Sequence, residues 1–114
     1  RDAARFEDAV ASFEEAGFGD DVFGPLVEAN LGDCLVELGD LAGAEGHFAA
    51  AASRAASGLA AKALAPMCSY KQALVLLELG NEDKARKVLQ GISNDFPNST
   101  YASNATALAA SLSK

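Results

Sequence analysis

The chain is poor in the residues from which active sites, metal sites and disulfide frameworks are built. Its 114 residues include no tryptophan, one histidine, one methionine, two cysteines and three prolines. Two distant cysteines form neither a disulfide framework nor a zinc or redox motif, and one histidine (His47) supplies neither a histidine metal site nor a catalytic triad. No glycine-rich phosphate loop occurs. We therefore expect no enzymatic activity, no metal and no cofactor.

Basic residues and long apolar runs are also scarce. The 9 Lys and Arg face 16 Asp and Glu, which gives a formal net charge of −7. This charge disfavours nucleic acid and anionic lipid, both of which need clustered cations. No run of about 18 apolar residues could span a bilayer. We expect protein or peptide partners, no nucleic acid, and no membrane contact by this domain itself.

What the chain has in quantity is alanine. Alanine supplies 25 of the 114 residues, and half of the chain is hydrophobic. Alanine is the strongest helix former because ordering it costs no side-chain entropy. The length suits one domain, and the apolar content argues against disorder. The composition therefore predicts one all-α domain.

A shift of 41 residues aligns the chain with itself. It places residues 34–40 on residues 75–81, Pro25 on Pro66, and Ala44 on Ala85. A third, partial copy begins near Phe6. A period of 20–50 residues is typical of a solenoid of stacked repeats.

Each copy carries a helix stop followed by a helix start. Gly39 and Gly80 can take the left-handed conformation that ends a helix, and Asp40 and Asn81 can cap the next one. So short a connection forces the paired helices to be antiparallel. Proline is tolerated in a first helical turn, which leaves residues 21–24 and 62–65 either helical or a loose or 3₁₀ lead-in. The pattern predicts helices at 3–17, 21–38, 41–57, 62–79, 82–95 and 99–112.

The same period predicts whether the two cysteines can form a disulfide. When equivalent helices stack in parallel, Cys34 aligns with Val75 and Cys68 aligns with Val27, so the thiols are seven residues out of register. Seven residues span about 10 Å of helix, whereas a disulfide needs Cα atoms within about 7 Å. We predict two free, buried thiols.

Helix–turn–helix units with small residues at fixed places resemble tetratricopeptide repeats. Small side chains let two helices approach closely, and a bulky neighbour fills the groove beside them. The pattern is carried by Gly32, Ala44, Phe48 and Ala51 in one unit, by Ala73, Ala85, Leu89, Ile92 and Pro97 in the next, and by Ala9, Phe13 and Ala16 at the front. The resemblance implies a right-handed α-α superhelix of about six helices in antiparallel pairs.

By the same resemblance, residues 1–114 form one domain. It divides into a partial repeat at 1–20, repeats at 21–57 and 62–97, and a capping helix at 98–114. Tyr101, Ala105, Leu108 and Leu112 form the inward face of that cap. The period of 41 residues exceeds the family's period of about 34 and adds about two helical turns to each unit.

Lengthened repeats of this kind resemble the C-terminal region of bacterial membrane-anchored tetratricopeptide proteins. The residues concerned are Gly24-Pro25, Gly32-Asp33, Pro66 to Lys71, and Phe96-Pro97-Asn98-Ser99. The resemblance implies the periplasmic side of the bacterial cell envelope and a longer parent chain with an upstream membrane anchor. Two alternatives stay open: a cytosolic adaptor, and an accessory domain of an enzyme whose active site lies outside residues 1–114.

The resemblance also implies a concave groove, lined by the first helix of each pair, in which proteins or peptides dock. The groove positions are Leu26, Ala29, Asp33, Val36, Glu37, Met67, Tyr70, Lys71, Leu74, Leu77 and Glu78. Among them, Met67 and Tyr70 are suitable anchors for a partner. The uncovered front edge, around Phe6 and Phe13, offers a site for self-association.

Relatives that bind acidic peptide C-termini carry a clamp of Lys, Arg and Asn in this groove. The matching places here hold Ala29, Asn30, Asp33, Met67 and Lys71, which do not rebuild the clamp, so we expect no capture of a peptide carboxylate. Lys71 lies one helical turn from the level of Asp33 on the neighbouring helix. We therefore expect a partly buried Asp33–Lys71 ion pair.

Overall fold

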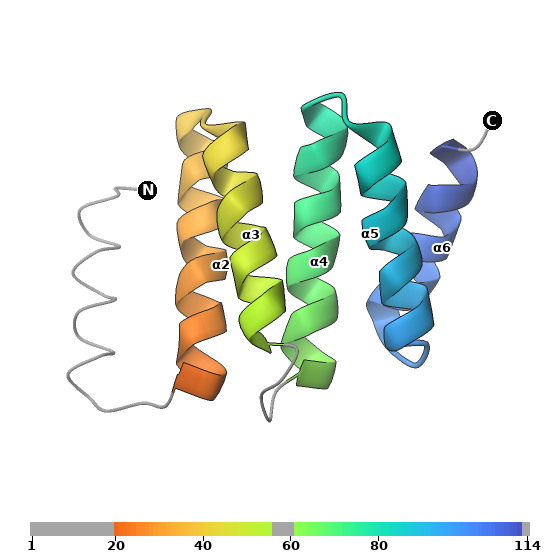
Figure 1. The fold of residues 1–114 in the computed structure, drawn as a ribbon, viewed down its shortest axis with the longest axis horizontal. Coiled ribbons are helices and arrows are strands. Elements are labelled where there is room, and N and C mark those ends of the chain that lie inside the picture. The colour runs from red at the N-terminus through yellow and green to blue at the C-terminus, as the bar shows by residue number, and fades with distance from the viewer. Residues whose placement is uncertain (1–19, 56–60, 113–114) are drawn as a thin grey trace.

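In a computed structural model of the protein, the described residues are 20–55 and 61–112. They form helices and no strand: α2 (Asp20–Leu38), α3 (Leu41–Ala55), α4 (Ala61–Glu78), α5 (Glu82–Asp95) and α6 (Thr100–Leu112). The all-α prediction is confirmed, and the predicted bounds agree closely with these helices (Figure 1). The predicted helix at 3–17, with Ala9, Phe13 and Ala16, lies outside the described residues.

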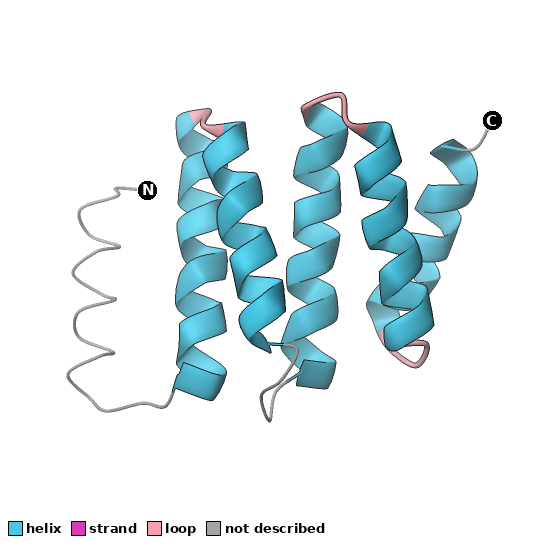
Figure 2. Cartoon of the chain, viewed as in Figure 1, coloured by secondary structure: helices cyan, strands magenta, loops and turns pink. Residues whose placement is uncertain are grey.

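The five helices stand side by side in chain order. Each packs mainly against the helix before it and the helix after it. The α2–α3 and α4–α5 turns lie at the same end of the helices, at the top of the view, and the α5–α6 turn lies at the bottom (Figure 2). Beyond these neighbours, α2 contacts α4 and α4 contacts α6, so the first helices of successive pairs also meet. This is the arrangement of a tetratricopeptide-like helical repeat.

The α2–α3 turn explains why the first helix ends where it does. Gly39 has φ +86°, and its N–H donates to the carbonyl of Val36 at 3.1 Å. The N–H of Asp40 donates to the carbonyl of Leu35 at 2.9 Å, which completes a Schellman motif. The Asp40 carboxylate then accepts the N–H of Gly43 at 3.0 Å and caps α3.

The α4–α5 turn repeats this geometry 41 residues later. Gly80 has φ +84°, and it and Asn81 donate to the carbonyls of Leu77 and Leu76. The Asn81 side chain accepts the N–H of Lys84 at 3.3 Å. Both predicted helix stops and both predicted caps are thus confirmed.

The two prolines lie within the helices. Residues 21–24 and 62–65 are α-helical, which places Pro25 and Pro66 at the sixth position of α2 and of α4. A proline there removes one hydrogen bond near the helix start, a smaller loss than at mid-helix. Both rings are fully buried, and this burial of apolar surface helps to offset the lost bond.

The predicted small and bulky positions form the core. Ala44, Ala51, Ala73 and Ala85 are fully buried, as are Phe48 and Leu89, and Ile92 is 2% exposed. Gly32 is buried too, and a Cβ built on it would lie only 2.6 Å from Cε1 of Phe48. Small residues therefore stand where helices approach closely, as predicted.

The last helix covers the end of the α4–α5 pair. Ala102, Ala105 and Ala109 of α6 are buried in a cluster with Ala73, Leu89 and Ile92. Tyr101, Leu108 and Leu112 pack partly buried against the same cluster. Ser99 accepts the N–H of Tyr101 at 3.1 Å at the helix start. The inward face predicted for this helix is confirmed.

Both cysteines are buried and free, as the register predicted. Within residues 20–55 and 61–112, none of the helices has the length and apolar character that crossing a bilayer requires.

Candidate functional site

A shallow depression of about 200 Å³ lies between α2 and α4. Five of its lining residues belong to the groove predicted from the sequence: Asp33, Val36, Lys71, Leu74 and Glu78. Phe48 and Val75, which are 1% and 6% exposed, form its floor. The first helices of the two pairs therefore converge on a hollow with an apolar floor.

An ion pair crosses this depression. Nζ of Lys71 donates to both carboxylate oxygens of Asp33, at 3.0 and 2.9 Å. The two side chains are 34% and 31% exposed, so the pair is partly buried, as predicted. Nζ of Lys71 also lies 5.9 Å from the centroid of the Phe48 ring, within the range of a cation–π contact. The Lys71 charge is therefore engaged by groups of the protein itself.

The apolar rim of the depression faces solvent. Val36 is 38% exposed on α2, and Leu74 is 42% exposed on α4. Glu37 and Glu78 are exposed beside them at the C-terminal ends of the same helices. The rim thus combines apolar side chains with carboxylates.

Six of the predicted groove residues do not line the depression. Two of them are Ala29, which is buried in the core, and Leu77, which is partly buried. Met67 is partly buried and packs against the core cluster that contains Phe48. Tyr70 packs against the α6 cluster, and its ring centroid lies 5.5 Å from that of Tyr101, at an interplanar angle of 49°. Leu26 is partly buried, and Glu37 is exposed next to the rim. Met67 and Tyr70, predicted as partner anchors, thus contribute to packing within the fold.

The predicted groove positions did not include the depression's floor. Phe48 belongs to the second helix of its pair, α3, and was predicted only as a bulky core residue. Gly32 is the feature of the sequence that could have indicated the position of Phe48, because its missing side chain leaves room for the ring. Val75, one position beyond Leu74, completes the floor.

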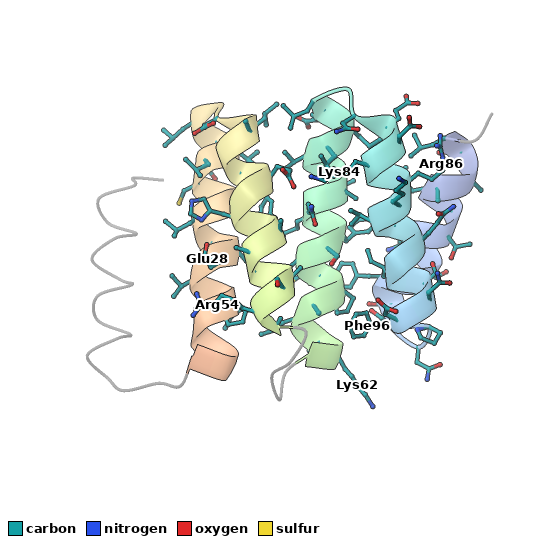
Figure 3. The ribbon with its side chains drawn as sticks, in the orientation of Figure 1. Glu28, Arg54, Lys62, Lys84, Arg86 and Phe96 are labelled. Atoms are coloured by element: carbon teal, nitrogen blue, oxygen red, sulfur yellow. The ribbon has the colours of Figure 1, made fainter. Side chains whose placement is uncertain are left out.

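Polar contacts elsewhere connect neighbouring helices. Oε2 of Glu28 on α2 lies 2.7 Å from Nδ1 of His47, and its Oε1 lies 3.5 Å from Nη1 of Arg54 on α3 (Figure 3). Nε2 of Gln72 on α4 donates to Glu45 of α3 at 2.8 Å, and Nζ of Lys84 on α5 lies 3.7 Å from the same carboxylate. The contact with Glu28 gives His47 a structural role.

The thiol of Cys68 lies near the Asp33–Lys71 pair but is not poised for chemistry. Burial raises its pKa to about 11, and the nearby Lys71 and Asp33 oppose each other with smaller effects, lowering and raising it. A thiol with so high a pKa stays protonated at neutral pH, and the protonated form is a poor nucleophile.

A second hollow, of about 230 Å³, lies at the opposite end of the helices, near the start of α4. It is lined by Lys62 and by the α5–α6 connection, residues 95–99 (Figure 3). Among the described residues, no group of three or more His, Cys, Asp and Glu side chains is placed to hold a metal ion.

Residues 68–99 match the family model described as tetratricopeptide repeat. No curated protein and no solved structure shows a significant match to the chain. The matched segment contains most of α4, all of α5 and the turn to α6, whereas residues 61–67 of α4 precede it. Residues 68–99 are therefore similar to a tetratricopeptide repeat, and the row of antiparallel helix pairs agrees with a helical repeat.

Proposed function

We propose that this chain is a non-enzymatic scaffold for protein–protein contact, and that its partner docks in the depression between α2 and α4. The observation that carries the proposal is the exposure of Val36 and Leu74 above the buried floor of Phe48 and Val75. An apolar side chain from a partner would cover this surface. Tetratricopeptide repeats generally mediate contacts between proteins, which agrees with this role.

The size of the depression favours a protein partner over a small molecule. Its volume is about 200 Å³, and it is open to solvent. Small-molecule and cofactor sites are usually clefts of about 300–1,000 Å³ that bury most of the ligand. A hollow of this size suits one or two side chains of a peptide or helix.

The experiment that tests the proposal compares two double variants in affinity capture from cell extract. Val36→Ala with Leu74→Ala removes the apolar rim. Leu38→Ala with Leu79→Ala is the matched control, because these residues are 66% and 45% exposed on the same two chain segments but do not line the depression. The rim variant should lose a partner that the wild type and the control retain.

Both variants must melt at temperatures close to that of the wild type, since the substituted side chains are exposed. Met67 and Tyr70 are avoided because they support the packing of the fold. Recovery of the same proteins by the wild type and by the rim variant would refute docking of a partner in the depression.

The proposal extends to location: the scaffold lies on the periplasmic side of a membrane-anchored bacterial envelope protein. It is supported by the resemblance of the lengthened repeat, with Gly32-Asp33 and Phe96-Pro97 among the residues that carry it. Fractionation of cells expressing the natural full-length protein tests this. Recovery in the cytosolic fraction would favour an adaptor, and a catalytic domain upstream of Arg1 would favour an enzyme accessory domain.

A further inference from the structure

We infer that the segment bound between α2 and α4 is basic and amphipathic, with a large apolar side chain flanked by Lys or Arg. This inference rests on the proposed function and specifies the chemistry of the partner. It is drawn from the charges around the depression.

Within residues 20–55 and 61–112, the lining of the depression offers no cation to an acidic partner. Lys71 is the one basic residue among the predicted groove positions, and both oxygens of the Asp33 carboxylate hold its ammonium group at 2.9–3.0 Å. The Phe48 ring lies on a further side of the same group. An incoming carboxylate would have to displace Asp33 to reach Lys71.

The described residues that line the depression carry a net negative charge. Asp33 and Glu78 contribute two negative charges and Lys71 contributes one positive charge, which leaves a net charge of −1. Glu78 is exposed, so a partner's cation can approach it without a large desolvation cost. Electrostatic complementarity therefore selects a basic segment.

The C-terminal end of α4 strengthens this negative potential. A helix dipole places partial negative charge at the C-terminus, where Lys, Arg or protonated His would stabilise the helix. The last turn of α4 contains no basic residue, and the helix ends on Glu78 instead. This arrangement is unfavourable for the stability of α4 and favourable for attracting a cation from outside.

The same charges disfavour a second copy of this chain as the occupant. Two copies meeting at this face would bring together like charges, each on a chain with a formal net charge of −7. The exposed Val36 and Leu74 then account for the apolar part of the partner segment, and the carboxylates beside them account for its basic part.

The experiment titrates the protein with three fluorescent peptides of equal length. One is a Leu/Lys amphipathic helix, one has Glu in place of every Lys, and one has Ser in place of every Leu. Binding is followed by fluorescence anisotropy and by ¹H–¹⁵N spectra. The Leu/Lys peptide should bind most tightly, shift the signals of Val36 and Leu74, and bind more weakly at high salt.

Two charge-reversal variants distinguish attraction of the peptide to the depression from attraction to the net negative charge of the whole protein. Glu78 ends α4 at the depression, and Asp95 ends the neighbouring, antiparallel α5 at the opposite end of the helices. Glu78→Lys and Asp95→Lys change the net charge equally, and each places a cation at a helix C-terminus. Glu78→Lys should weaken binding of the Leu/Lys peptide about fivefold relative to Asp95→Lys, since an exposed ion pair contributes up to about 1 kcal/mol.

The outcomes distinguish this inference from the proposed function. Tighter binding of the Leu/Glu peptide, with shifts at Val36 and Leu74, would refute the inference that the partner segment is basic. It would still agree with docking of a partner between α2 and α4. Equal weakening by the two variants would show general attraction and overturn the inference. Shifts at Val36 and Leu74 that grow with protein concentration alone, with sedimentation of a dimer, would assign the face to a second copy. Failure of all three peptides to shift these signals would refute the inference that a basic segment binds here. The capture experiment would test separately whether a partner docks in the depression.

Discussion

Gly32 on α2 faces the ring of Phe48 on α3, and a Cβ at position 32 would lie 2.6 Å from Cε1 and 2.8 Å from Cδ1 of that ring. Phe48 is 1% exposed and belongs to the core cluster, so it has little room to move. The absence of a side chain at Gly32 thus sets the distance between α2 and α3. It also fixes the ring that forms part of the floor of the depression.

Alanine substitution at Gly46 and at Gly32 should therefore affect the stability of the fold differently. Gly46→Ala meets no atom within 4 Å and should stabilise the fold by up to about 1 kcal/mol through helix propensity. Gly32→Ala must displace the Phe48 ring, and its free energy of unfolding should fall about 1–3 kcal/mol below that of Gly46→Ala. Urea denaturation measures both. Equal stabilisation by the two variants would mean that Gly32 is not needed for close packing.

The buried alanines at positions 44 and 85 should not accept a larger side chain. Both are fully buried and equivalent under the 41-residue shift. Ala44→Leu and Ala85→Leu should each cost about 1–3 kcal/mol by overpacking the helix crossing. Ala42→Leu, at an exposed position of α3, is the control and should change little. Unchanged melting temperatures in the two buried variants would contradict the role of these alanines.

The Asp33–Lys71 ion pair should behave as a coupled unit. Each single variant, Asp33→Asn or Lys71→Met, leaves one partly buried charge without its partner, and should cost more than the double variant. The coupling energy from a double-mutant cycle should be about 0.5–1 kcal/mol and should fall with added salt. The more exposed Asp83–Arg86 pair is the comparison and should show weaker coupling. Additive effects at Asp33 and Lys71 would indicate that the contact contributes nothing to stability.

Because of Cys68, the free energy of unfolding should fall as the pH becomes alkaline. Its pKa is raised from 9.0 to about 11, so the folded chain binds the thiol proton more tightly than the unfolded chain. The stabilisation is therefore fully present below about pH 9 and is lost as the pH rises towards about 11. In Cys68→Ala this part of the decline should disappear. Urea denaturation between these pH values measures the difference, and identical slopes would contradict the raised pKa.

Both thiols should also resist reagents in the folded protein and react only after denaturation, because Cys34 and Cys68 are buried. An intact mass two units low under non-reducing conditions would reveal a disulfide and contradict the free thiols.

The local fold could be predicted because its signals are local. Gly39 and Gly80 take the left-handed conformation that helix stops require, and Asp40 and Asn81 cap the helices that follow. The period then placed equivalent helices side by side, and this register was sufficient to predict the Asp33–Lys71 pair.

The accessible surface of the groove could not be predicted in the same way. Period and register do not give the rotation of one helix about its axis relative to the next. That rotation brings Tyr70 against Tyr101 of α6 and places Phe48 of α3 beneath the ion pair. Side chains on one face of α4 therefore divide between partner-accessible and core positions. The sequence could not decide whether the residues before Pro25 and Pro66 are helical for a related reason. Burial of the proline rings in tertiary contacts determines whether these residues join the helix.

The seven residues by which α4 precedes the family match, 61–67, have a consequence for how the molecule unfolds. The first helix α4 has 18 residues and the second helix α5 has 14, and a longer first helix extends the contact between successive pairs. In a linear array, stronger coupling between neighbours relative to the stability of each unit favours all-or-none unfolding. Glu45, which contacts Gln72 and Lys84, adds a polar link from one pair to the next. We therefore expect α2–α3 and α4–α5 to melt together in a single transition.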